Sequence, residues 1–147
     1  MTYLDSSALL KLFWREPESS AIVQAVGREP IVVISSLTQL ETLSQLKAAH
    51  LAGEYSLAVW RRLELQFSAL RNQAPFEFRD LPASLFASAL RQHRNSARVH
   101  CRTLDRLHLA AMEELALSRL MTHDQAQATA ALALGFAVTM PGREPLA

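Results

Sequence analysis

The chain opens with Thr2-Tyr3-Leu4-Asp5-Ser6-Ser7-Ala8-Leu9-Leu10-Lys11-Leu12-Phe13. This pattern predicts a short apolar strand that ends in a carboxylate, followed at once by a helix. In open parallel sheets, ligands bind outside the carboxyl ends of the strands, so Asp5 stands where a site would form. A second interpretation makes Asp5 the N-cap of the helix, with Ser6 and Ser7 as other capping candidates. The positions of the remaining aspartates decide between the two.

The composition indicates one folded domain and excludes several classes of protein. The chain has 147 residues, half of them hydrophobic, which is enough for a full core. Its single cysteine, Cys101, excludes an internal disulfide. No apolar run is long enough to span a bilayer and no signal peptide is present, so we expect a cytoplasmic protein with no membrane contact. We expect a single domain over residues 1–142 and a short C-terminal tail over 143–147.

The charge is nearly balanced, at +1, so no bulk field indicates a nucleic-acid partner. The positive charge is almost all arginine, the side chain best suited to grip phosphate, and lysine occurs only at Lys11 and Lys47. Five arginines fall close together around a predicted polar loop over 94–101. They are Arg91, Arg94, Arg98, Arg102 and Arg106. The cluster is either a solvated helix face or a set of phosphate contacts.

Strands and helices alternate along the whole chain. Short apolar runs at 31–34, 120–124 and 136–139 predict buried strands, and the alternating pattern at 75–79 suits an edge strand. The order predicts an α/β fold, a parallel sheet of about four to five strands with helices on both faces. Right-handed crossovers place the first and fourth strands side by side.

Two helices in the middle of the chain are predicted from capping and periodicity. Ser36 and Gln39 match a capping box for a helix that runs to about Gly53. Its inner side is expected to carry Leu37, Leu40, Leu43 and Ala48. Glu41 follows Leu37 by one turn, so it lies on this side, either as a snorkelling side chain at the edge or as part of a site.

The next helix, over 55–73, is amphipathic, with a stripe that includes Trp60 and Phe67. We interpret these two aromatic residues as core. The alternative is a dimer or partner surface, because aromatic residues and arginine are enriched at interfaces.

The last third of the chain carries two further aspartates, one in the first turn of a predicted helix and one at the end of a predicted strand. Thr103 is predicted to cap a helix, with Asp105 in its first turn, where the helix dipole favours negative charge. His108 faces inward on this helix and is interpreted as a satisfied core histidine rather than a general base. Leu120-Met121-Thr122-His123-Asp124 repeats the opening pattern of a strand that ends in an aspartate.

Four carboxylates are therefore expected at one edge of the sheet: Asp5, Glu41, Asp105 and Asp124. Clustered carboxylates repel one another and their pKa values rise unless a cation joins them. Oxygen ligands without a histidine or cysteine cluster suit Mg²⁺ or Mn²⁺. Magnesium at such a site points to phosphoryl chemistry.

The whole chain resembles the PIN-domain nucleases, most closely the VapC-type toxins of bacterial toxin–antitoxin pairs. The resemblance rests on the opening stretch Tyr3–Leu12, on Thr38–Glu41, on Arg102–Ala110, on Leu120–Asp124 and on Ala133–Val138. It implies a three-layer α/β/α sandwich. It also implies that Asp5, Glu41, Asp105 and Asp124 bind the metal and that Ser7 and Thr122 are hydroxyl neighbours of the site.

The resemblance further implies hydrolysis of RNA phosphodiesters with Mg²⁺ or Mn²⁺, homodimers and an antitoxin partner. Arg102 and Arg106 are candidates for holding RNA phosphates. One departure is Gln125-Ala126-Gln127, where relatives often carry basic residues. Two alternatives stay open: a catalytically silent RNA-binding or scaffold protein, and a phosphatase with Asp5 as nucleophile, although that class wants a second acid where Ser7 stands.

Overall fold

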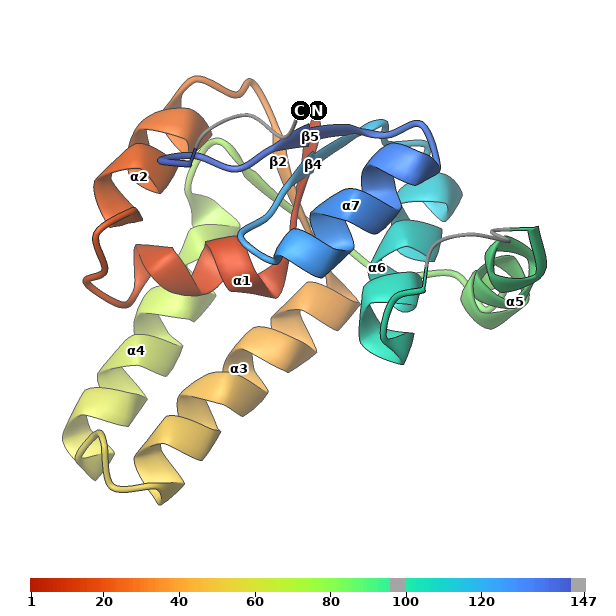
Figure 1. Ribbon diagram of the computed structural model, residues 1–147. Helices are drawn as coiled ribbons and strands as arrows, with labels where there is room; N and C mark the ends of the chain where they lie inside the picture. Colours follow the sequence, from red (N-terminus) through yellow and green to blue (C-terminus); the bar gives the residue numbers. More distant parts are fainter. Residues whose placement is uncertain (96–99, 144–147) are drawn as a thin grey trace.

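The computed structural model describes residues 1–95 and 100–143 and shows an α/β sandwich with a parallel sheet between two helical layers (Figure 1). Five strands pair in the order β3-β2-β1-β4-β5, all parallel. Their bounds are β1 (Thr2–Leu4), β2 (Val32–Ser35), β3 (Phe76–Arg79), β4 (Arg119–Met121) and β5 (Ala137–Thr139). The predicted fold class is confirmed, including β3 at an edge and β1 beside β4.

The connections between strands are helical, as parallel pairing requires. The helices are α1 (Ser6–Leu9), α2 (Ser19–Gly27), α3 (Ser36–Leu51), α4 (Leu57–Ala69), α5 (Leu85–Asn95), α6 (Thr103–Glu114) and α7 (Gln125–Ala133), with short 3₁₀ turns at Leu10–Leu12 and Leu70–Asn72. The predicted tail falls almost wholly on 144–147, outside the described residues. So do Arg98 and part of the predicted loop.

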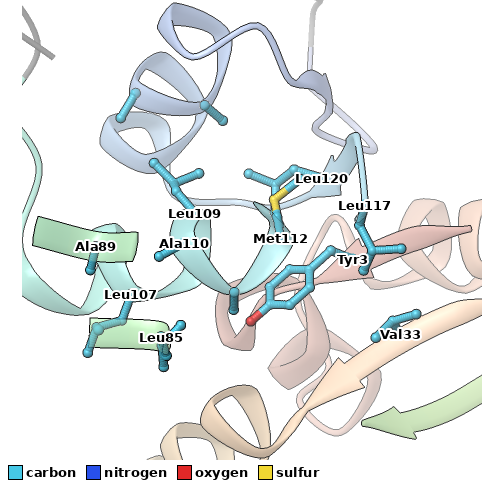
Figure 2. Close-up of a cluster of buried hydrophobic side chains, with 13 residues drawn as sticks. Tyr3, Val33, Leu85, Ala89, Leu107, Leu109, Ala110, Met112, Leu117 and Leu120 are labelled. Atoms are coloured by element: carbon cyan, nitrogen blue, oxygen red, sulfur yellow. The ribbon is translucent and has the colours of Figure 1, made fainter. Parts of the chain in front are cut away.

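Consecutive residues of β1 point to opposite faces of the sheet and enter different cores. Tyr3 joins a cluster on the face covered by α5, α6 and α7, where Figure 2 shows it among side chains from α6 and β2. Leu4 joins a cluster on the other face with residues of α1, α2 and α4. Burial on both faces explains why the central strands read as continuous apolar runs.

The long helices α3 and α4 lie side by side and extend away from the sheet (Figure 1). Phe67 near the end of α4 is only 1% exposed and packs in the core, which confirms its interpretation as a core residue. The expected inner side of α3 is wrong in part, since Leu40 is 65% exposed and Ala48 is also exposed, while Thr38, Thr42, Leu46 and Ala49 are buried. The buried side of α3 faces α1 and α4 and begins with two threonines, and Leu40 lies on another side of the helix.

Candidate active site

The two strand-end aspartates lie next to each other because β1 and β4 are neighbours in the sheet. The backbone N–H of Asp5 donates to the carbonyl of Met121 at 3.2 Å, which continues the pairing past the strand end. Thr122 connects the two acids: its hydroxyl donates to Asp5 Oδ2 and accepts from the backbone N–H of Asp124 at 3.0 Å. The Ser7 hydroxyl lies 3.2 Å from that of Thr122. Both predicted hydroxyl neighbours are thus in contact with Asp5.

Each strand-end aspartate also caps the helix that follows it. Asp5 Oδ1 accepts from the backbone N–H of Ala8 at 3.0 Å and from the Ser7 hydroxyl at 2.8 Å. Asp124 Oδ1 accepts from the backbone N–H of Gln127 at 3.0 Å. The cap of α1 is therefore Asp5 and neither serine. The two interpretations offered for Asp5 are compatible, because one carboxylate oxygen caps while the other faces Thr122.

Glu41 reaches the same place from α3. The helix begins at Ser36, and its N-cap is Ser35, one residue before the predicted cap. Glu41 Oε2 accepts from the Ser6 hydroxyl at 2.5 Å and from Nε2 of His108 at 2.8 Å. Because Ser6 is adjacent to Asp5, this contact brings the α3 carboxylate beside the strand-end pair.

Asp105 is held by the residue that caps its own helix. The N-cap of α6 is Arg102, so the prediction of Thr103 as cap is wrong and Thr103 is the first helical residue. Asp105 Oδ2 accepts from the Arg102 backbone N–H at 3.1 Å and from its Nε at 3.0 Å, while Nη2 reaches Oδ1 at 3.1 Å. The same guanidinium donates to Asp124 Oδ2. Arg102 therefore bridges the fourth acid to the strand-end pair.

The four predicted acids thus converge at one edge of the sheet. Thr122 connects Asp5 to Asp124, and Arg102 connects Asp124 to Asp105. Glu41 joins them through Ser6, the residue after Asp5. Within residues 1–95 and 100–143, no group of three or more His, Cys, Asp or Glu side chains already has the arrangement of a metal centre. The contacts explain why: Arg102 lies between Asp105 and Asp124, and hydroxyl groups occupy the oxygens of Asp5. The cation that joins two of the acids here is a guanidinium.

The acids differ in their electrostatic state. Burial raises the pKa of the Asp5 carboxyl above its ordinary value, and His108 and the hydroxyl of Thr122 offset part of this rise. The hydrogen bond from His108 lowers the pKa of Glu41, with a smaller contribution from Ser6. The rise at Asp5 therefore comes from desolvation, and not from repulsion between carboxylates, which was the cause expected from the sequence.

The arginine cluster does not form one continuous phosphate surface in the described residues. Arg91 pairs with Glu113, and Arg102 binds the acids with 71% of its side chain exposed. Arg106 is only 7% exposed and lines a pocket of about 270 Å³ between α5 and α6. Among the described arginines of the cluster, Arg102 alone is both exposed and in contact with the acids.

Sequence reasoning missed the contact between His108 and Glu41. His108 is a buried, hydrogen-bonded histidine as expected, but one of its partners is a site carboxylate. A signal existed, since His108 follows Asp105 by three positions and therefore lies on the same face of α6. The geometry also disfavours Asp5 as a nucleophile, because it is fully buried and its second-neighbour Ser7 hydrogen bonds to it.

Comparison of the sequence with known proteins identifies one family. The sequence profile of the PIN domain matches residues 2–132. The chain belongs to the PIN domain family. It is 34% identical to Ribonuclease VapC46 of Mycobacterium tuberculosis over 145 residues, which cover 95% of this chain and 96% of that protein.

Several solved structures share the fold at low sequence identity. VapC20 of M. tuberculosis, a sarcin–ricin loop cleaving toxin, superimposes with a TM-score of 0.71 at 15% identity, covering 96% of this chain and 100% of that one. FitAcB of Neisseria gonorrhoeae gives a TM-score of 0.72 at 15% identity, with 96% and 98% covered. A toxin–antitoxin complex of Klebsiella pneumoniae gives 0.65 at 17% identity, with 96% and 98% covered. In the described part of this PIN domain, no helix is long and apolar enough to cross a membrane.

Proposed function

We propose that this PIN-domain protein is a metal-dependent endoribonuclease and the toxin of a type II toxin–antitoxin pair. The observation that carries the proposal is the convergence of Asp5, Glu41, Asp105 and Asp124, brought from four helices and strands to one sheet edge. Full-length similarity to a curated ribonuclease supports the reaction class. Burial disfavours the charged form of Asp5, and a bound cation would offset that cost.

The donor set fits Mg²⁺ or Mn²⁺. All four side chains offer carboxylate oxygens, the ligands that hard divalent cations prefer, and no cysteine thiolate lies among them. A bound divalent cation would activate a water molecule and stabilise the charge that develops on the phosphate. Arg102 marks the position where positive charge is already favourable, because it bridges Asp105 and Asp124.

The chain's own side chains have separate tasks in this proposal. Thr122 and Ser7 donate to Asp5 and keep both of its oxygens oriented. Arg102 has most of its side chain in solvent, so it can leave the acids when a divalent cation arrives and then hold an RNA phosphate. For Arg106 a phosphate contact stays a prediction, and its burial does not support it.

We also propose that the protein forms homodimers, binds an antitoxin and acts in the cytoplasm. The Klebsiella neighbour, which is a toxin–antitoxin complex, supports the antitoxin partner. On this molecule, exposed leucines on the projecting α3–α4 pair offer apolar surface for a protein partner. They are Leu40, Leu51, Leu57 and Leu65. Phe67 does not contribute, because it is core.

The proposed reaction is tested by incubating the purified protein with a mixed pool of single-stranded RNA. We expect internal cleavage with millimolar Mg²⁺ or Mn²⁺ and none with excess chelator. Cleavage that persists in chelator would contradict the metal mechanism. Absence of cleavage in every pool and with either metal would contradict the nuclease proposal and favour a catalytically silent RNA-binding or scaffold protein.

A further inference from the structure

A buried imidazole joins the candidate site to the core of the molecule. His108 lies on α6 with only 2% of its side chain exposed. Its Nε2 is 2.8 Å from Glu41 Oε2, and its Nδ1 is 2.8 Å from the hydroxyl of Tyr3. Two hydrogen bonds at opposite ends of the ring fix its orientation.

The direction of the first hydrogen bond follows from the chemistry of the partner. An ionised carboxylate can only accept, so Nε2 of His108 must carry the proton that it shares with Glu41. The ring of Tyr3 packs in the apolar cluster of Figure 2. Its hydroxyl also contacts the Ser35 hydroxyl at 2.7 Å. Ser35 is the N-cap of α3, the helix that carries Glu41. The hydrogen-bonded chain therefore ties down both the start of α3 and its carboxylate.

The two oxygens of Glu41 are not equivalent. Both hydrogen bonds that the described residues make to this carboxylate, from Ser6 and from His108, end on Oε2. In the described part of the chain, Oε1 accepts none. A carboxylate anchored through one oxygen presents the other to whatever binds at the site.

We infer that His108 is a positioning residue, which anchors Glu41 through Nε2 so that Oε1 is presented to a divalent cation among the four acids. This inference rests on the proposed function, because it gives Glu41 a cation to bind. Outer partners of metal-binding side chains act in this way, by fixing the orientation of the ligand.

A second histidine provides a matched control. His50 at the far end of α3 stacks on Trp60 with ring centroids 5.0 Å apart and contacts the backbone carbonyl of Tyr55 at 2.8 Å. It has a hydrogen bond and a ring contact like those of His108, but no contact with a site acid. Replacing it tests what the loss of a partly buried histidine does to the fold alone.

The experiment measures Mn²⁺ affinity by calorimetry for wild type, His108→Leu, His108→Gln, Glu41→Gln, the double variant His108→Leu/Glu41→Gln, and His50→Leu. We expect His108→Leu to weaken binding by about 10–100-fold, the usual effect of losing an outer partner. His108→Gln keeps an amide donor in place of Nε2 and should recover most of the affinity. His50→Leu should bind as wild type does.

The double variant separates positioning from a general structural role. If His108 acts through Glu41, the double variant should bind no more weakly than Glu41→Gln alone. Tyr3→Phe keeps the ring packing and removes the hydroxyl that orients His108, so it should show a smaller loss in the same direction. Nitrogen-15 spectra of the metal-free protein should find the proton on Nε2 of His108.

Three results would overturn the inference: wild-type affinity in His108→Leu, losses that multiply in the double variant, or a neutral His108 with its proton on Nδ1. Wild-type protein that binds no Mn²⁺ would contradict the proposed function itself and this inference with it. The two failures are therefore distinguishable.

Discussion

The four acids of the site fall into two pairs that are held in different ways. Asp5 and Asp124 follow strands, and backbone N–H groups of the next helix and the hydroxyl of Thr122 hold them. Glu41 and Asp105 lie on helices and depend on side chains, His108 for one and Arg102 for the other. Both strand-end acids are held by backbone N–H groups of the next helix, with Arg102 as an added partner of Asp124. The orientation of the helix pair depends mainly on the side chains of His108 and Arg102.

This difference has an electrostatic consequence. Among the described residues, Asp5 is in direct contact with neutral donors only, and burial raises its pKa, so its charge is destabilised in the absence of metal. Glu41 is stabilised as an anion, mainly through His108, and its pKa is lowered. A cation would therefore stabilise the folded protein more at Asp5 than at Glu41.

The largest effect is expected on RNA cleavage when a strand-end acid loses its charge. Asp5→Asn and Asp124→Asn preserve the helix caps, because asparagine caps as well as aspartate. We expect cleavage to fall by more than about 100-fold, beyond the loss typical of outer-shell changes. The matched control is Asp80→Asn, the one aspartate outside the cluster, which is exposed and should cleave as wild type does. Equal cleavage by Asp5→Asn and Asp80→Asn would show that Asp5 serves only as a helix cap and would contradict its role in the reaction.

A smaller effect, of opposite sign for Asp5 and Glu41, is expected on metal-free stability. At pH 7 in chelator, Asp5→Asn should raise the free energy of unfolding by about 0.5–2 kcal/mol, because it removes a buried charge. Glu41→Gln should lower it by about 1 kcal/mol or more, because it weakens a hydrogen bond to a charged group. Chemical denaturation measures the free energy of unfolding of both variants. A change of the same sign in Asp5→Asn and Glu41→Gln would contradict the comparison.

The pH dependence of these variants follows from the pKa directions. Between the ordinary pKa of aspartate and the raised folded value, only the folded state keeps the proton of Asp5, so stability falls as pH rises through that window. The advantage of Asp5→Asn should therefore disappear in acid. Glu41 has a lowered pKa, so its contribution is present above the ordinary glutamate pKa and is lost as pH falls through the folded value. The deficit of Glu41→Gln should shrink there.

The smallest effect on stability is expected for Arg102, whose side chain is 71% exposed. Arg102→Ala should change the free energy of unfolding by at most about 1 kcal/mol, as for other exposed ion pairs. It should nevertheless tighten Mn²⁺ binding, because no guanidinium has to leave the acids. It should also weaken RNA binding and reduce the slope of log affinity against log salt concentration by about 1. Arg62→Ala on α4 is the control. Weaker Mn²⁺ binding in Arg102→Ala than in this control would contradict the proposal that Arg102 leaves the acids when a divalent cation binds.

The strand-end half of the site could be predicted from the sequence for a physical reason. Short β-branched runs followed by helices specify a parallel sheet, and chain order with right-handed crossovers places β1 beside β4. An acid that ends each of these strands must then lie at the shared edge. Asp5 and Asp124 needed no knowledge of side-chain packing.

The helix half could be placed but not explained. Glu41 and Asp105 lie where expected, but their partners were not predicted. The partner of Glu41, His108, comes from a distant part of the chain, whereas Arg102 lies only three residues before Asp105. The cap of α3 shifts from Ser36 to Ser35 because a hydroxyl one residue away is an equally good cap in sequence. The cap of α6 shifts from Thr103 to Arg102, where the Asp105 carboxylate accepts from the Arg102 backbone N–H and no hydroxyl is needed. Leu40 was misplaced for another reason: the buried side of α3 carries Thr38 and Thr42, so the leucines do not mark it.

The most direct test of the central claim, that these acids bind a divalent cation, is the thermal response to metal. Wild type, Asp5→Asn and Asp80→Asn are unfolded in chelator and in Mn²⁺ at about 100 times its Kd. Binding to the folded state should stabilise wild type and Asp80→Asn by about 2.7 kcal/mol and raise their Tm. Asp5→Asn should unfold at the same temperature in both solutions. An equal rise in all three proteins, or no rise in wild type, would contradict the claim.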